Sequence, residues 1–214
     1  MRRPLALAAL LAAQLALSAL LAVAPARAGD YLETFEAGKD PQSIMAGTLL
    51  LGSDGSWQGE LRDGAYLLSN KGQAGGVRYF HLRQRQDAAP KEVSISVDVS
   101  GSFDGQVAGA GLLYDFGQDG KSYFAFVLGK DAHYTLWRRG PNGFQRVATG
   151  DNAAIRPDGI NLLAARLGDA KAELTINGAR ILAHKAEGAT DRAVGIIALD
   201  TGSYRFDNFH YAVQ

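Results

Sequence analysis

The second half of the chain, from Gly109 to Gln214, alternates apolar strand-length segments with short turns that contain glycine. The strongest turn signal is Asn177-Gly178, which joins two such segments directly. A type I′ hairpin turn needs positive φ at both central residues, and an Asn-Gly pair tolerates that conformation. Asn142-Gly143 marks a second tight reversal. Because no stretch of helical period runs longer than a turn or two, this rhythm predicts an all-β protein.

The first half of the chain shows the same pattern with wider gaps, after a loop-rich region that ends near Asp54. Strands are predicted at four places: 32–35, 66–69, 77–82 and 93–99. In the last of these, Val and Ile alternate with Ser and Asp, so one face should be buried and the other solvated. An irregular connection is expected at 152–158, because Pro157 keeps the preceding residue out of the α region. No linker or repeat divides the chain, which favours one antiparallel two-sheet sandwich.

The first 28 residues have the features of a secretory signal peptide. Arg2 and Arg3 precede an uncharged run from Pro4 to Pro25, and Ala26-Arg27-Ala28 places small residues at the two positions that signal peptidase recognises. We expect cleavage after Ala28, which leaves residues 29–214 as a periplasmic or secreted domain. The apolar run is also about long enough to span a bilayer, so a retained membrane anchor is the alternative.

Charge and cysteine content narrow the classes of function. Removal of residues 1–28 leaves 19 basic residues against 22 acidic ones, a formal charge of −3. This balance, with no basic stripe, argues against binding to nucleic acid. The chain contains no cysteine, so packing, or a metal ion, must stabilise an exported form that has no disulfides.

A series of short motifs follows a fixed order along the mature chain: Glu33-x-Phe35, GLLYDF, SYFAFVL, HYTLWR, IRPDGINLL, LTINGARIL, VGIIAL and RFDNFHY. This order resembles the concanavalin A-like lectin/glucanase superfamily, and more narrowly the bacterial secreted laminin-G-like jelly-roll domains. The resemblance covers most of the mature chain. Its motifs are mostly structural, so they imply the jelly-roll fold more strongly than any function.

Catalytic motifs of this superfamily are missing from the sequence. Its retaining glycoside hydrolases carry E-x-D-x-x-E on one strand, whereas the comparable stretch here, from Glu92 to Val99, has no second glutamate at the required offset. No Gly-x-Ser-x-Gly motif occurs, and the histidines have no metal-binding spacing. The segment 119–122 lacks the glycine of a phosphate-binding loop and is interpreted as a hairpin turn. No catalytic residue is therefore predicted, and an enzyme stays an alternative.

The resemblance also implies a structural Ca²⁺ ion between the N-terminal segment and the last strand. Asp207, in the FDNF motif, matches the carboxylate ligand of that site. Glu36, or carbonyl groups near Gly38, would supply further oxygen ligands, which a hard ion prefers. The alternative is that Asp207 only bonds to neighbouring backbone groups at a strand bend.

Outward-facing aromatic side chains are candidates for sugar binding, because they stack on the C–H faces of sugar rings. If Phe124 and Phe126 face the core, Tyr123 faces outwards, and the parity of the next segment directs Trp137 and Arg139 outwards as well. The predicted ligand-binding residues are Tyr114, Tyr123 and Trp137 on a concave sheet, with Asp115, Arg139 and Asn70 at its rim. The alternative for each aromatic residue is packing in the core.

Three functions are compatible with these observations. The leading prediction is an exported lectin-like module that binds a glycan or cell-envelope polymer without catalysis. The first alternative is a divergent glycoside or keto-sugar hydrolase of the same fold, which needs two carboxylates that face each other across the groove. The second is a structural domain that binds a protein partner in the envelope, which needs a large exposed apolar patch.

Overall fold

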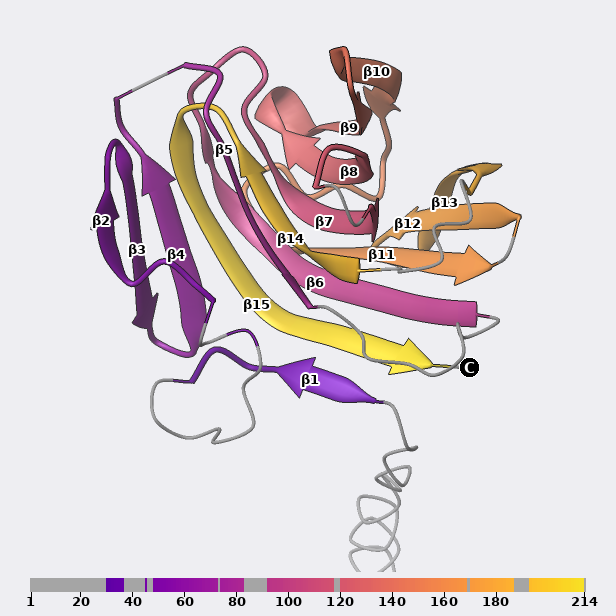
Figure 1. The fold of residues 1–214 in the computed structure, drawn as a ribbon, viewed down its shortest axis with the longest axis horizontal. Helices are drawn as coiled ribbons and strands as arrows, with labels where there is room; N and C mark the ends of the chain where they lie inside the picture. Colours follow the sequence, from indigo (N-terminus) through magenta and orange to yellow (C-terminus); the bar gives the residue numbers. More distant parts are fainter. Residues whose placement is uncertain are drawn as a thin grey trace, which may run out of the picture.

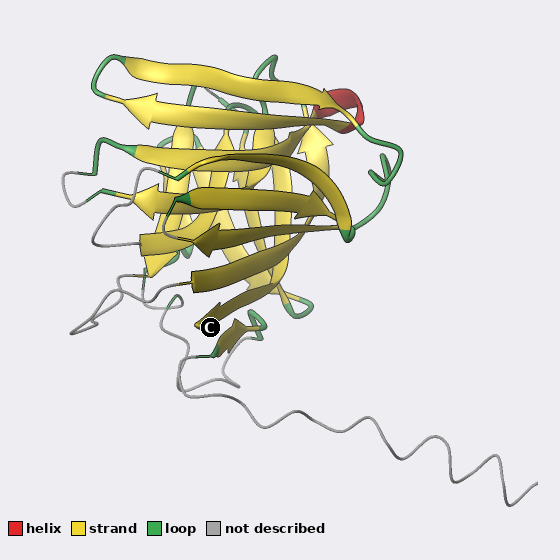
Figure 2. Ribbon diagram, turned by 90° about the vertical axis from the view of Figure 1, so that its right-hand side faces the viewer, coloured by secondary structure: helices red, strands yellow, loops and turns green. Residues whose placement is uncertain are grey.

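The computed structural model describes residues 30–36, 45, 48–72, 74–82, 92–117, 120–168, 170–186 and 193–213. These residues form two antiparallel β-sheets that pack face to face as a sandwich (Figure 1, Figure 2). The predicted all-β fold is therefore confirmed. In the described part of the chain, no helix is long and apolar enough to cross a membrane. The predicted signal peptide, residues 1–28, lies outside this part and stays a prediction.

The larger sheet has nine strands. Eight of them lie in the order β13 (Ala179–Lys185), β12 (Lys171–Ile176), β11 (Asn161–Gly168), β6 (Glu92–Phe103), β15 (Gly202–Val213), β4 (Ala65–Asn70), β3 (Trp57–Arg62) and β2 (Gly52–Asp54). The ninth, β1 (Tyr31–Glu33), pairs with the far end of β15, where Leu32 lies opposite His210.

The smaller sheet has six strands, in the order β10 (Gly143–Asp151), β9 (His133–Gly140), β8 (Tyr123–Gly129), β7 (Gly109–Phe116), β14 (Ala193–Leu199) and β5 (Val77–Leu82). One turn of 3-10 helix, Lys130–Ala132, connects β8 to β9. The last two strands of the described chain each lie inside one sheet. Strand β15 lies between β6 and β4 in the larger sheet, and β14 lies between β7 and β5 in the smaller one.

The main core lies between the sheets. In β6 every second residue from Val93 to Val99 is buried and the intervening residues are half-buried, as the alternation predicted. Tyr66 of the larger sheet is fully buried and meets Phe80 of the smaller sheet edge to face, with 5.5 Å between ring centroids. Burying one large apolar side chain contributes about 1.5–3 kcal/mol, so this layer dominates the stability of the sandwich.

The turn signals are confirmed where the structure describes them. Asn177 and Gly178 connect β12 to β13 with φ of 50° and 81°, the two positive values that a type I′ turn requires. The Asn177 side chain also donates hydrogen bonds to the Ala154 carbonyl at 2.7 Å and to Asn161 Oδ1 at 2.9 Å. These bonds hold the irregular connection at 152–158 against the hairpin.

Strand β3 was missed by the sequence analysis, although β4, with which it pairs, was found. Gly59 interrupts its pattern, and the structure shows why a glycine is needed there. A Cβ atom at this position would lie 2.1 Å from the Leu50 carbonyl oxygen and 2.8 Å from the Tyr66 hydroxyl. The segment around Leu50 therefore packs directly on the strand. The same glycine interrupts the apolar alternation, which is why the sequence pattern did not indicate a strand.

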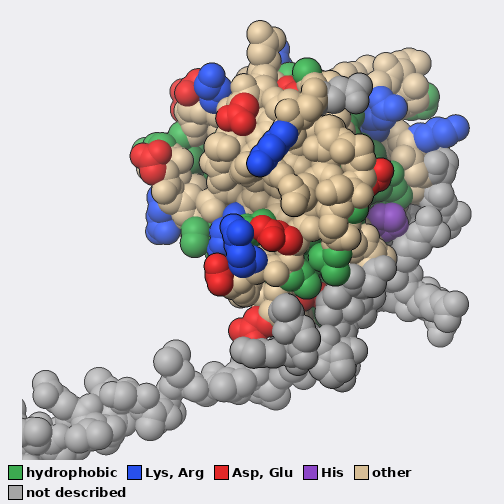
Figure 3. All heavy atoms as spheres, turned by 90° about the vertical axis from the view of Figure 1, so that its left-hand side faces the viewer, with side chains coloured by type: hydrophobic (Ala, Val, Ile, Leu, Met, Phe, Trp, Pro, Cys, Tyr) green, Lys and Arg blue, Asp and Glu red, His purple; other side chains and the backbone are tan. Residues whose placement is uncertain are grey.

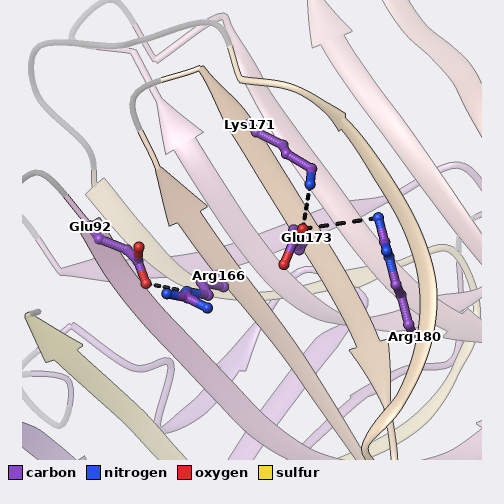
Figure 4. A network of polar contacts seen from close by, with 5 residues as sticks. All are labelled: Glu92, Arg166, Lys171, Glu173 and Arg180. Atoms are coloured by element: carbon purple, nitrogen blue, oxygen red, sulfur yellow. Dashed lines mark hydrogen bonds and ion pairs between the residues drawn. The ribbon is translucent and has the colours of Figure 1, made fainter.

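The outer face of the larger sheet is polar. The side of the molecule that carries β2, β3 and β4 shows mainly backbone and uncharged polar atoms, with scattered charged side chains and small groups of hydrophobic side chains between them (Figure 3). Towards the other end of the sheet, Arg166 pairs with Glu92, and Glu173 pairs with Lys171 and, at 3.9 Å, with Arg180 (Figure 4). The hydrogen bond from Lys171 holds the pKa of Glu173 below its ordinary value.

Candidate binding cleft

Three of the predicted ligand-binding residues lie together on the outer face of the six-stranded sheet. Tyr123 of β8 is paired with Arg139 of β9, and Ala125 is paired with Trp137, so these side chains leave the sheet on the same side. The opposite side of β8 carries Phe124 and Phe126, which belong to the main core. The parity argument for β8 and β9 is thus confirmed.

Tyr114 does not belong to this face, so the expectation that it joins Tyr123 and Trp137 is wrong. It is paired directly with Phe124, and residues that are paired across two strands share a face. Tyr114 is therefore fully buried on the inner side, stacked on Phe124 with 5.6 Å between ring centroids. Its hydroxyl lies 2.7 Å from His184 Nε2, and burial raises the pKa of Tyr114 well above its ordinary value.

Asp115 and Asn70 do not form an exposed rim either. Asp115 is 5% exposed, with φ of 50°, at a bulge in β7. This extra residue allows Leu113 and Phe116 to reach the same outer face, although simple alternation would separate them. Asn70 is 1% exposed, and its amide donates a hydrogen bond to the Asp200 carbonyl at 2.9 Å. Both residues are therefore too buried to form the rim of a binding site.

Five aromatic side chains gather on the outer face of the six-stranded sheet and are called the aromatic cluster: Tyr79, Phe116, Tyr123, Trp137 and Phe144. Neighbouring rings lie between 5.2 Å apart, for Tyr79 and Phe116, and 6.2 Å apart, for Trp137 and Phe144. Tyr123 is 5% exposed, and burial raises its pKa to about 12. Trp137 and Phe144 are partly exposed. The cluster is thus closed at its centre and partly exposed at Tyr79 on one end and at Trp137 and Phe144 on the other.

A cleft of about 260 Å³ begins at the end of the cluster formed by Trp137 and Phe144. Its lining combines the two exposed rings with residues from three neighbouring connections and strand ends: Gly75, Gly76, Val77, Val107, Trp137, Phe144, Leu199 and Asp200. Arg139 lies beside it, with its guanidinium carbon 5.3 Å from the centroid of the Phe144 ring. The cleft therefore offers apolar ring faces together with a small number of polar groups, which is the usual composition of a small-ligand site.

Asp200 fixes the end wall of the cleft. Its carboxylate accepts hydrogen bonds from the backbone N–H of Gly75 at 2.9 Å, of Val107 at 3.3 Å and of Thr201 at 2.9 Å. It is 3% exposed and has φ of 64°. A Cβ atom at Gly105 would lie 2.3 Å from its Oδ2 atom, so the β6–β7 connection needs glycine to approach this closely. One side chain thus joins the β4–β5, β6–β7 and β14–β15 connections.

Sequence reasoning missed Phe144 and Asp200. Phe144 could have been predicted from the sequence, because the Asn142-Gly143 turn sets the register between β9 and β10. That register pairs Phe144 with Arg139 and so places it on the same face as Trp137. Asp200 gave no such signal. Its partners come from two other connections far away in the chain, and only the folded structure brings them together.

The predicted calcium ligands are not brought together by any described contact. Asp207 accepts a hydrogen bond from Arg205 at 2.9 Å and one from the Asn208 backbone N–H at 2.8 Å. Glu36 lies beside the β3–β4 turn, near Gly64. Within the described ranges, no group of three or more His, Asp or Glu side chains is arranged to hold a metal ion. Gly38 lies outside those ranges, and the calcium site stays a prediction.

Solved structures resemble this chain in fold. The carbohydrate-binding module CBM66 from Bacillus subtilis is 11% identical with a TM-score of 0.53, over 68% of this chain and 86% of that one. The carbohydrate recognition domain of Emp46p is 11% identical with a TM-score of 0.54, over 74% and 88%. The Bacteroides ovatus xyloglucan PUL protein GH43B is 14% identical with a TM-score of 0.58, over 86% of this chain but 39% of its own.

These identities are low enough that the likeness shows the fold alone, a two-sheet β-sandwich that carbohydrate-binding domains also adopt. The finer laminin-G-like resemblance stays a prediction. No protein-family model matches the chain, and no curated protein sequence matches it.

Proposed function

We propose that the chain is an exported, non-catalytic glycan-binding module whose aromatic cleft holds a sugar ring. The observation that carries this proposal is the position of Trp137 and Phe144. Both rings line a cleft of about 260 Å³, both are partly exposed, and both are fixed from behind by the aromatic cluster. A ring that is already immobilised loses little conformational entropy when a sugar stacks on it.

The polar groups beside the rings have complementary roles. Arg139 covers part of Phe144, which makes Trp137 the principal stacking platform. The Arg139 guanidinium donates up to five hydrogen bonds, so it would bind sugar hydroxyl oxygens at the edge of the stacked ring. At the end wall the Gly75 N–H and the Gly76 carbonyl are already bonded to Asp200, so Arg139 is the main polar group beside the rings. A shallow site of this kind should bind weakly, with a dissociation constant of roughly micromolar to millimolar.

A hydrolase receives less support from the same site. A retaining glycosidase needs two carboxylates about 5–5.5 Å apart, and an inverting one needs them about 6.5–9.5 Å apart. Asp200 is the one carboxylate in the described lining of the cleft, and three backbone N–H groups already bind it.

A protein-interaction domain also receives less support. The large hydrophobic side chains that are exposed in the described structure are dispersed over several segments: Leu32, Leu51, Val107, Val147, Ile160 and Leu162. This distribution does not form the broad apolar patch that a stable protein interface would need.

The experiment is a glycan-array screen followed by calorimetric titration of Trp137→Ala with the best neutral ligand. We expect the variant to weaken binding about 5- to 150-fold, which corresponds to about 1–3 kcal/mol of lost stacking. The control is Val147→Ala, which removes another exposed apolar side chain from β10 outside the cleft and should leave the affinity unchanged.

A reducing-end assay on the same preparation separates binding from hydrolysis. Release of product in proportion to the protein concentration would overturn the non-catalytic proposal. Equal affinities of Trp137→Ala and the wild type would overturn the assignment of the cleft.

A further inference from the structure

We infer that the aromatic cleft selects sugars that carry a methyl group, either that of an acetamido group or the C6 methyl of a deoxy sugar. This preference rests on the proposed function, because it names the class of glycan that the same site would take. It follows from a difference between the two walls of the cleft. Trp137 and Phe144 come from β9 and β10, at one edge of the six-stranded sheet, whereas Val77 and Leu199 come from β5 and β14, at the other.

The wall opposite the rings is aliphatic. Val77 and Leu199 are paired across β5 and β14, so their side chains share a face. Val107, in the β6–β7 connection, adds a third aliphatic side chain to the lining. Leu199 is 5% exposed, whereas Val107 is 46% exposed and leaves apolar surface in contact with water. A ligand methyl group that covers this surface would bind favourably.

The charged residue of the described lining, Asp200, has little left to offer a sugar hydroxyl. Its carboxylate is 3% exposed and accepts bonds from three backbone N–H groups, one of them that of Val107. Its own N–H donates to the Gly76 carbonyl at 2.7 Å, and its carbonyl accepts a bond from the Asn70 amide at 2.9 Å. A hydroxyl at this wall would lose water without gaining a partner in Asp200, which is unfavourable, whereas a methyl group loses nothing of the kind.

The aliphatic wall is held in place by hydrogen bonds of the β6–β7 connection. The backbone N–H groups of Asp104 and Gly105 both donate to the Thr201 carbonyl at 3.1 Å. The Val107 N–H is bound at 3.3 Å to the Asp200 carboxylate. A wall that is already ordered loses little conformational entropy when a ligand covers it, so the preference should appear in the affinity.

The size of the cleft suits one sugar ring with a short substituent. Its volume of about 260 Å³ is below the range of about 300–1,000 Å³ that drug-sized ligands occupy. The main polar group lies at the wall of rings, where the Arg139 guanidinium carbon is 5.3 Å from the Phe144 centroid. A sugar stacked on Trp137 would therefore direct hydroxyl groups towards Arg139 and a methyl substituent towards Val107.

The test compares matched neutral sugars by calorimetric titration of the whole mature protein. The β-1,4-linked tetramers of N-acetylglucosamine and of glucose differ in the acetamido group, and D-fucose and D-galactose differ in the hydroxyl group at C6. We expect the methyl-bearing member of at least one pair to bind about 4- to 10-fold more tightly than its partner. The pair that shows the difference identifies which methyl group the cleft takes.

Val107→Thr tests the wall itself, because it adds a hydroxyl group that donates and accepts hydrogen bonds. It should weaken binding of the methyl-bearing sugar and reduce the preference to about twofold or less. The matched control is Val147→Thr, the same change at a valine of β10 that is 47% exposed and does not line the cleft. This control should keep the preference of the wild type. Trp137→Ala should instead weaken both members of a pair, since it removes the stacking platform.

The outcomes separate the methyl preference from the proposed function. Equal affinities within both pairs would overturn the preference and leave glycan binding intact. The same preference in Val107→Thr as in the wild type, or equal losses in Val107→Thr and Val147→Thr, would overturn the role of the aliphatic wall. If none of the four sugars binds, the preference is overturned, and the glycan array decides the proposed function by itself.

Discussion

The outer faces of the two sheets differ in how deeply their outward-pointing side chains are buried. On the six-stranded sheet, outward-facing Leu113, Ala125 and Ile197 are at most 1% exposed, because the aromatic cluster packs over them. On the larger sheet, the outward-facing residues of β6, such as Ser94 and Ser96, are half-buried and polar. The first face therefore acts as a second small core with a cleft at its margin, whereas the second is a solvated surface.

This difference changes how an aromatic residue on an outer face should be interpreted. Tyr123 points outwards, yet it is as buried as many residues of the main core. Trp137 belongs to the same cluster but remains accessible at the cleft. Outward parity is thus necessary for ligand binding but not sufficient, and stability and binding should depend on different members of one cluster.

The largest expected effect tests whether the aromatic cluster is a core. Tyr123→Ala should lower the free energy of unfolding by about 3–5 kcal/mol, the usual cost of truncating a buried aromatic side chain. Ser96→Ala, on the outer face of the larger sheet, should change it by less than about 1 kcal/mol. Urea unfolding of both variants measures the two values. Similar small effects would show that the two outer faces are alike.

A smaller loss is expected from Asp200→Ala, because three backbone N–H groups would lose their acceptor at the end wall of the cleft. We expect about 2–4 kcal/mol of destabilisation, together with weaker binding of the neutral ligand. Asp200→Asn keeps one acceptor oxygen and tolerates positive φ, so it should lose less. If both variants unfold like the wild type, the connections are held by other contacts.

The next largest effect is expected at alkaline pH, which should lower the free energy of unfolding through the buried Tyr123. Burial raises the pKa of Tyr123 from 10 to about 12, so the folded state holds this phenolic proton more tightly than the unfolded state does. That contribution is complete below pH 10 and is lost as the pH rises towards 12. Unfolding at several pH values should show the decline, and Tyr123→Phe should reduce it. An unchanged decline in Tyr123→Phe would assign it to other buried tyrosines, such as Tyr66 and Tyr204, whose pKa values burial also raises.

The smallest effect is expected for the ion pairs on the outer face of the larger sheet (Figure 4). Arg166 pairs with Glu92 at a solvated surface, where screening and side-chain entropy offset most of the attraction. Arg166→Ala should therefore leave the melting temperature almost unchanged, and any difference should shrink in high salt. A clear drop in melting temperature would mean that this face contributes to stability as the aromatic face does.

The fold was accessible from the sequence because its signals are local. Asn177-Gly178 specifies its own turn geometry, and the alternation from Val93 to Val99 specifies a buried face within one strand. The face of Tyr114 was not accessible in this way. It depends on the register between β7 and β8 and on the bulge at Asp115, neither of which can be inferred from alternation within a single strand.

The candidate site was accessible only in part, for the same physical reason. Trp137 and Arg139 could be placed because one strand and its hairpin partner determine their side. The cleft itself is made by connections that are distant in the chain, and Asp200 joins them through bonds to Gly75 and Val107. The depth of the cleft and the burial of Tyr123 therefore emerge only when the whole sandwich has formed.

The internal positions of β14 and β15, each between two other strands of its sheet, have a consequence for how the protein folds. Before these strands are available, each sheet exists as two separate parts, and each part has unpaired strand edges that can associate with other chains. Completion of both sheets requires pairing between strands at opposite ends of the chain, such as β1 with β15, which raises the contact order and slows folding. Truncation before Ala193 would therefore not remove two dispensable edge strands. It would divide the larger sheet between β6 and β4, separate β5 from the rest of the smaller sheet, and expose the apolar interior.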